Sequence, residues 1–221
     1  RDPEMSRGLG DVYKRQAYDV IQNLFPDKNK DFVFNITEND IVLVKEVKNN
    51  IDVRDLEKLA RSISDTLSSE FFTKVNVGIG TPVVGVKDLA RSFKEAQTAL
   101  EVGKVFDTDK NIVSYDNLGI ARLIYHLPTT LCETFLKEVF KKNSIESLDH
   151  ETLFTIQKFF ENSLNVSETS RKLFVHRNTL VYRLDKIKKL TGLDLREFDH
   201  AIIFKIALMV KKYLAANPTK F

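Results

Sequence analysis

The sequence predicts an α+β protein in which a mixed α/β region is followed by an all-helical region. Between residues 31 and 47, polar and apolar residues alternate and β-branched residues are frequent, which is typical of strands. From Leu118 onward, apolar residues recur at three- and four-residue spacing, which is typical of helices. The change of pattern predicts two structurally different parts of the chain.

The first part is predicted to open with a hairpin and to continue with alternating helices and strands. Residues 37–40, Thr-Glu-Asn-Asp, are of types that favour a turn. Residues 31–47 therefore predict two antiparallel strands joined by this turn. Asp88 is a candidate helix cap and Gly103 a candidate helix end. The other predicted elements are the end of a helix at 17–25, a helix at 52–69, a strand at 72–79, a helix between Asp88 and Gly103, and a short strand at 112–115.

The second part is predicted to be a series of helices. Pro128 separates the first two of them, because proline cannot continue a helix from the residues before it. Phe159 and Phe160 are candidate packing residues of this helical region. The predicted helices cover residues 118–126, 129–142, 149–161, a short pair within 165–189, and the strongly apolar stretch 201–214.

The composition excludes several classes of protein. Hydrophobic residues make up 43% of the chain, which is too many for a disordered protein, yet no apolar run is long enough to span a bilayer. The single cysteine, Cys132, excludes a disulfide framework, and four histidines leave little material for a metal site. We therefore predict no metal and no cofactor. No signal peptide is visible, so the expected location is the cytoplasm.

The charges are unevenly distributed along the chain. Residues 163–193 carry seven cations and two anions, a net charge of +5, whereas residues 17–162 carry 18 cations and 23 anions, a net charge of −5. A basic segment attached to an acidic body is typical of a polyanion-binding module. A solvated basic helix face would give the same charge, so the composition alone leaves both readings open.

Residues 165–189 have the pattern of two short helices joined by a tight turn. Asn165, followed three residues later by Glu168, is a helix start of the capping-box type. Ser170 is small, as a close helix crossing requires, and residues 174–176 form the connection. A second helix then covers about residues 177–189. This arrangement predicts a helix-turn-helix.

The second helix of this pair has one apolar side and one polar side. At about 100° per residue, Leu180, Leu184 and Ile187 form a narrow apolar stripe. Asn178, Tyr182, Lys186 and Lys189 fall on the opposite side, with Arg177 and Arg183 on the flanks. These outward groups are of the kinds that hydrogen-bond base edges and phosphates. The alternative is a surface helix of an ordinary bundle.

The stretch NVSETSRKLFVHRNTLVYRLDKIKKLTGLDL, residues 165–195, closely resembles the C-terminal helix-turn-helix of the PucR/CdaR family of bacterial regulators. The resemblance implies a transcriptional regulator that binds specific DNA sequences. Because one small helix-turn-helix buries limited DNA surface, we expect a homodimer on double-stranded DNA. The family resemblance and the helix phase together predict these DNA-binding residues: His176, Arg177, Asn178, Thr179, Tyr182, Arg183, Lys186 and Lys189.

The stretch VNVGIGTPVVGVKDLARSFKEAQTALEVGK, residues 75–104, resembles the later half of a GGDEF-like domain. On that alignment, the turn at 37–40 lies where an active nucleotide cyclase carries Gly-Gly-Asp-Glu. The glycines would let phosphates approach the backbone, and none is present here, so the resemblance implies a catalytically inactive relative. A nucleotide-binding or cyclic-dinucleotide signalling domain remains the alternative function.

The first sixteen residues do not fit the pattern that follows them. The string GLGDVYKRQ at 8–16 resembles translated sequencing-adapter sequence, so we expect residues 1–16 to be non-native and the true N-terminus to be missing. The family resemblance then implies a preceding sensory domain, which would bind a small-molecule inducer. The expected domains are a degenerate GGDEF-like domain at 17–116 whose first strand is missing, a helical connector at 117–162 and the DNA-binding domain at 163–221.

Overall fold

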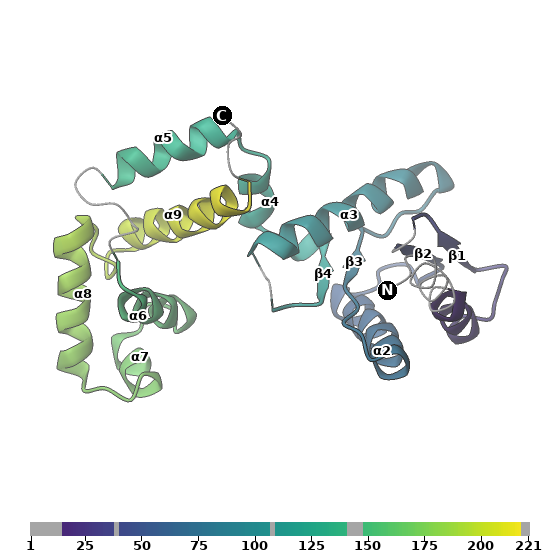
Figure 1. Ribbon diagram of the computed structural model, residues 1–221, viewed down its shortest axis with the longest axis horizontal. Coiled ribbons are helices and arrows are strands. Elements are labelled where there is room, and N and C mark those ends of the chain that lie inside the picture. The colour runs from purple at the N-terminus through teal and green to yellow at the C-terminus, as the bar shows by residue number, and fades with distance from the viewer. Residues whose placement is uncertain (1–14, 38–39, 107–108, 141–147, 218–221) are drawn as a thin grey trace, which may run out of the picture. The chain divides into compact units, whose positions relative to one another are not determined.

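The structure is a computed structural model that describes residues 15–37, 40–106, 109–140 and 148–217. The chain divides into two compact units, residues 1–119 and 120–221. None of the described helices is both long enough and apolar enough to cross a membrane. As expected, strands occur in the first unit, and every element of the second unit is a helix over its described residues (Figure 1).

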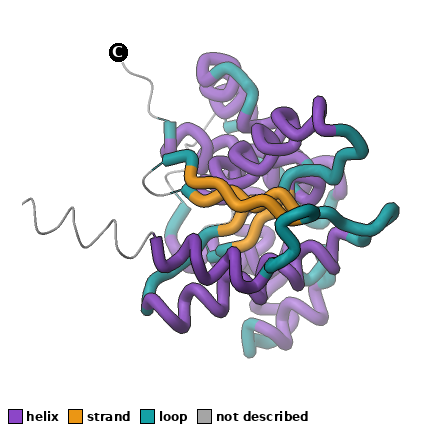
Figure 2. The backbone as a smooth tube through the Cα atoms, turned by 90° about the vertical axis from the view of Figure 1, so that its right-hand side faces the viewer, coloured by secondary structure: helices purple, strands orange, loops and turns teal. Residues whose placement is uncertain are grey.

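The first unit contains the predicted hairpin. β1 (Asp31–Asn35) pairs antiparallel with β2 (Ile41–Lys45), and Val33 lies opposite Leu43. The strands of this unit are drawn in orange in Figure 2. Val33 is buried in a core with Ile63 and Leu67 of α2 (Val53–Phe71) and with the helix that runs to residue 24. The hairpin is confirmed, but its covered face carries Asp31 and Val33, whereas Phe32, Phe34 and Ile36, whose alternation predicted the strand, are exposed. Glu38 and Asn39 of the predicted turn lie outside the described residues.

The strand predicted at 72–79 is mostly wrong. α2 (Val53–Phe71) begins at the cap Asp52, whose carboxylate accepts the N–H of Arg54 at 2.8 Å. The helix ends at Phe72, which has a left-handed φ of 51°. The chain turns there, and only the end of the predicted strand pairs in a sheet, as β3 (Val77–Ile79). β3 pairs in parallel with β4 (Ile112–Ser114), which confirms the short last strand.

Gly103 does not end the next helix, as the sequence had suggested. A 3₁₀ turn, η1 (Val86–Asp88), leads into α3 (Leu89–Phe106), which continues past Gly103. A Cβ atom at this position would lie 2.7 Å from Cγ2 of Val113 in β4. The glycine therefore serves close packing between α3 and the sheet. A second 3₁₀ turn, η2 (Tyr115–Asn117), follows β4.

The second unit contains all the predicted helices, with ends shifted by a few residues. Its core includes the fully buried side chains of Ile156, Phe159, Leu180, Leu184 and Phe204. Phe159 thus packs against the helix-turn-helix, as predicted, and Phe160 lies at the edge of the same core. The helices are α4 (Ile120–Tyr125), α5 (Thr129–Val139), α6 (His150–Glu161), α7 (Val166–Lys172), α8 (Arg177–Thr191) and α9 (Phe198–Ala216) (Figure 1).

Candidate nucleic-acid interface

α7 begins as its sequence predicts and packs closely against α8. The side-chain oxygen of Asn165 accepts the N–H of Glu168 at 3.0 Å, so Asn165 is the N-cap. Thr169 and Ser170 are both buried, and the Ser170 hydroxyl donates to the backbone oxygen of Ser167 at 2.9 Å. A small side chain whose polar group is satisfied within its own helix lets the two helices approach.

The turn between α7 and α8 is short and hydrogen-bonded. The N–H of Phe174 donates to the Arg171 carbonyl at 3.1 Å, and the N–H of Val175 donates to the Ser170 carbonyl at 3.0 Å. His176 then caps α8, because its Nδ1 accepts the N–H of Asn178 at 3.2 Å. Of the predicted DNA-binding residues, His176 is therefore the one that fixes where the second helix starts.

The rotation of α8 about its axis agrees with the predicted helix phase. Leu180, Leu184 and Ile187 are at most 1% exposed and belong to the core of the unit. Asn178 and Tyr182, on the opposite side, are exposed to solvent. The apolar stripe thus faces the protein, and the polar side faces outward.

One flank of α8 is held by the first turn of α6. Arg183 forms an ion pair with Glu151 and donates to the Thr155 hydroxyl at 3.2 Å, and its side chain is only 26% exposed. Lys186 lies 3.3 Å from the carboxylate of Asp149. Two of the predicted DNA-binding cations are therefore already paired within the protein.

Asp149 also caps α6, since its carboxylate accepts the N–H of Thr152 at 2.7 Å. Hydrogen bonds from Thr152, and secondarily the ammonium of Lys186, lower the pKa of Asp149 to about 2. The carboxylate consequently stays charged at neutral pH. It ties the start of α6 to the middle of α8.

The other flank of α8 is held by the loop that leads to α9. The buried carboxylate of Asp194 accepts from Nε of Arg196 at 2.7 Å and from Nζ of Lys188 at 3.1 Å. Arg196 also donates to Asp185 of α8 at 2.7 Å. Hydrogen bonds from the Arg196 guanidinium hold the pKa of Asp194 well below its usual range. The loop thereby fixes the C-terminal half of α8.

The outer side of α8 carries polar side chains that no other described residue engages. Its exposed members were all predicted from the sequence and are Arg177, Asn178, Thr179, Tyr182 and Lys189. Sequence reasoning missed Phe174, an exposed aromatic residue in the turn. The sequence did hold a signal, because an aromatic side chain at position 174 was assigned only to the turn between the two helices.

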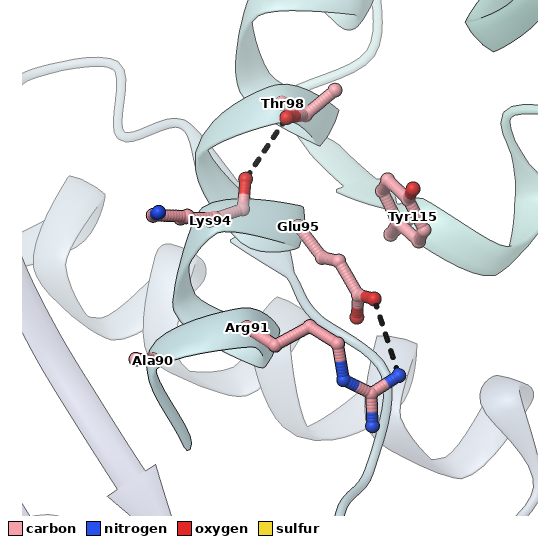
Figure 3. A pocket seen from close by; sticks show the side chains of 6 residues that line it. All are labelled: Ala90, Arg91, Lys94, Glu95, Thr98 and Tyr115. Carbon is pink, nitrogen blue, oxygen red and sulfur yellow. Dashed lines mark hydrogen bonds and ion pairs between the residues drawn. The ribbon is translucent and has the colours of Figure 1, made fainter. Parts of the chain in front are cut away.

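The described residues of the first unit present an open pocket on α3 as a candidate binding site. An open pocket of about 500 Å³ on α3 is lined by Arg91, Glu95 and Tyr115 among others (Figure 3). The carboxylate of Glu95 accepts the N–H of Thr81 at 3.1 Å and lies 3.7 Å from Arg91, so protein groups already satisfy it. Within the described ranges, no cluster of three or more His, Cys, Asp or Glu residues could hold a metal ion.

Comparison with known proteins identifies both halves of the chain. Residues 6–102 match the family model of the GGDEF-like domain, and residues 152–210 match that of the PucR C-terminal helix-turn-helix domain. The second match contains α7, the turn and α8, which are the elements that build the outer face described above.

Several characterised regulators are similar to the chain. The carbohydrate diacid regulator of Escherichia coli is 27% identical over 84% of this chain and 49% of its own length. The purine catabolism regulatory protein of Bacillus subtilis is 26% identical over 67% of this chain and 28% of its own. The DNA-binding transcriptional activator AdeR of the same species is 26% identical over 80% and 42%. The chain thus matches half or less of the length of each of these relatives. By its two domain matches and these relatives, the chain belongs to the PucR/CdaR family of transcriptional regulators.

Proposed function

We propose that this chain binds duplex DNA in a sequence-specific manner and regulates transcription, with α8 as the recognition helix. One observation carries the proposal. The inner side and both flanks of α8 are occupied by protein contacts, whereas the outer side presents polar groups that no other described residue engages and that can hydrogen-bond DNA. A helix with one such side fits the major groove, which is wide enough to admit it.

The outer residues divide by position along α8. Arg177, Asn178, Thr179 and Tyr182 lie in its first two turns, and the N-terminal part of a recognition helix reaches the base edges. Asparagine can pair with adenine and arginine with guanine, each through two hydrogen bonds. Lys189 lies near the far end and suits a phosphate contact. Together these contacts would provide both specificity and affinity.

Arg183 and Lys186 have a different role in the proposal. Each can reach a phosphate only by leaving a carboxylate of α6, namely Glu151 or Asp149. The Lys186 pair is exposed and is therefore screened by solvent, so Lys186 can exchange its partner. Arg183 is more enclosed and also bonds Thr155, so we assign it to holding the helix in place.

The partners beyond DNA are inferred from the family. A single unit of this size covers little DNA, so we propose a homodimer that binds two half-sites. The relatives are named for carbohydrate diacids and purine catabolism, which favours a catabolic operon and a small-molecule inducer bound outside this chain. Binding to the chromosome would take place in the cytoplasm.

A salt titration tests the proposal. Binding of the chain to a fluorescently labelled duplex should weaken steeply as salt rises, because each neutralised phosphate contributes about 0.9 to the slope of log affinity against log salt. Arg177→Gln should weaken binding at low salt. Lys205→Gln is the matched control, since Lys205 is exposed on α9 with no ion-pair partner among the described residues and its loss changes the net charge equally. An affinity that does not change between low and physiological salt would reject the proposal.

A further inference from the structure

The turn before α8 places an aromatic residue in a backbone conformation that usually holds glycine. Phe174 has a φ of 54°, and the paired hydrogen bonds to the carbonyls of Arg171 and Ser170 form the helix ending in which the left-handed residue is commonly glycine. The end of α8 follows that preference, because Gly192 there has a φ of 80°. The C-terminal ends of α7 and α8 thus both use a left-handed residue, which is a phenylalanine after α7 and a glycine after α8.

No described part of the protein covers the ring of Phe174. Its side chain is 96% exposed, whereas its neighbours Leu173 and Val175 pack against the core. The residue therefore carries the strain of a left-handed conformation, and its apolar surface contributes nothing to the core. Isolated exposed apolar residues are ordinary on a surface. Strained conformations of non-glycine residues cluster at functional sites, including positions that contact a ligand.

The neighbours of Phe174 indicate the chemistry of that ligand. Lys172 precedes it and Arg177 follows it, and both cations are exposed with no partner among the described residues. An aromatic ring between two unpaired cations complements a polyanion that also has apolar surface. Duplex DNA has both, because phosphates alternate with deoxyribose rings along its backbone, and protein aromatic rings can also wedge between base steps.

We propose that Phe174 is a further DNA-contacting residue, whose ring packs against the sugar–phosphate backbone at the edge of the groove that α8 enters. The proposal rests on the DNA-binding function proposed above and adds a contact that depends on no base identity. Lys172 then neutralises a phosphate beside the ring, while Arg177 at the start of α8 is left to reach the base edges. The DNA contact of the ring would then account for an aromatic residue at a strained, left-handed position.

The test compares two glycine substitutions in the 221-residue chain. Phe174→Gly removes the ring and relieves the left-handed backbone. Phe72→Gly is the matched control, because Phe72 ends α2 with a φ of 51° and is 95% exposed. Both variants should melt at or above the temperature of the parent. Only Phe174→Gly should bind a fluorescent duplex of random sequence more weakly at low salt, by roughly tenfold.

Two further readouts separate a ring contact from other effects. The salt slope of Phe174→Gly should equal that of the parent, because a phenyl ring neutralises no phosphate. Phe174→Tyr should keep most of the affinity. Parental affinity in Phe174→Gly, or a melting temperature well below that of the parent, would overturn the assignment of Phe174. An equal loss of affinity in Phe72→Gly would overturn it as well. If the parent itself fails to bind any duplex, the proposed function falls too.

Discussion

α8 presents two unlike surfaces to its surroundings. On the inner side and the flanks, Leu184 enters the core, Arg183 pairs with α6 and Lys188 pairs with the loop before α9. On the outer side, Asn178 and Tyr182 engage no other described side chain. The contacts of the first surface fix the position and rotation of the helix, so the second surface is presented in a defined orientation.

The difference between the two surfaces also changes how the net charge of +5 on residues 163–193 is interpreted. Four of its seven cations pair with carboxylates of the protein, and these are Arg171, Arg183, Lys186 and Lys188. Three of the four carboxylates involved lie outside residues 163–193 in the sequence, at positions 149, 151 and 194. The electrostatic field at the outer side of α8 is therefore weaker than the net charge of residues 163–193 suggests. It comes mainly from Lys172, Arg177 and Lys189.

The largest effect is expected from the inner side of α8. Leu184→Ala should leave a cavity and lower the free energy of unfolding by about 2–5 kcal/mol. A domain of this kind has only about 5–15 kcal/mol of stability, so DNA binding should be lost because the fold fails. Thermal melting and DNA affinity should be measured together on the same preparation.

Tyr182→Ala is the control for the opposite surface. Tyr182 is two residues from Leu184 in the sequence, but its side chain is exposed on the outer side. This variant should melt like the parent and bind DNA more weakly. If Leu184→Ala melts like the parent while Tyr182→Ala unfolds, the assignment of inner and outer surfaces is reversed.

The inner surface could be predicted from the sequence because its signal is local. Leu180, Leu184 and Ile187 follow the helical period, and the structure buries all three. The cap at Asn165 is also local, since it contacts a residue only three positions away. Both features depend on helix geometry that neighbouring residues determine by themselves.

The flanks could not be predicted, because their partners are distant in the sequence. Lys186 meets a carboxylate 37 residues earlier, and Arg183 bonds a hydroxyl 28 residues earlier. Periodicity places both cations near the outer face without showing what lies beside them. The expectations for residues 72–79 and for Gly103 were wrong for a related reason. A left-handed Phe72 and close packing against Val113 are invisible to a pattern of residue types.

An intermediate effect is expected at the flank held by Asp194. Asp194→Asn keeps the shape of the side chain but removes its charge. It should destabilise the protein by about 1–3 kcal/mol, because it weakens the bonds from Arg196 and Lys188 at a buried position. Asp65→Asn is the control, since Asp65 is exposed and has no partner in the part of the chain that the structure describes. Denaturant unfolding at neutral pH measures both variants.

The same pair of variants has a pH signature. The pKa of Asp194 is lower in the folded protein than in the unfolded chain, where it is about 3.9. Its contribution to stability is thus complete above about pH 5 and is lost progressively as the pH falls toward the folded value. The parent and Asp65→Asn should lose stability across this acid range more steeply than Asp194→Asn does. Parallel curves for all three would show that Asp194 does not hold the flank.

The smallest effect is expected at the boundary between the two surfaces of α8, where Arg183 and Lys189 can be compared. Arg183→Gln breaks a partly enclosed ion pair and should lower stability by about 1 kcal/mol, with no change in the salt slope of DNA binding. Lys189→Gln should do the reverse, leaving the melting temperature unchanged while reducing the slope by about 0.9. Adding Glu151→Gln to Arg183→Gln should cost little more, because the two residues share one interaction. If Arg183→Gln reduces the slope as Lys189→Gln does, Arg183 leaves Glu151 to contact a phosphate, and the flank toward α6 belongs to the DNA-binding surface.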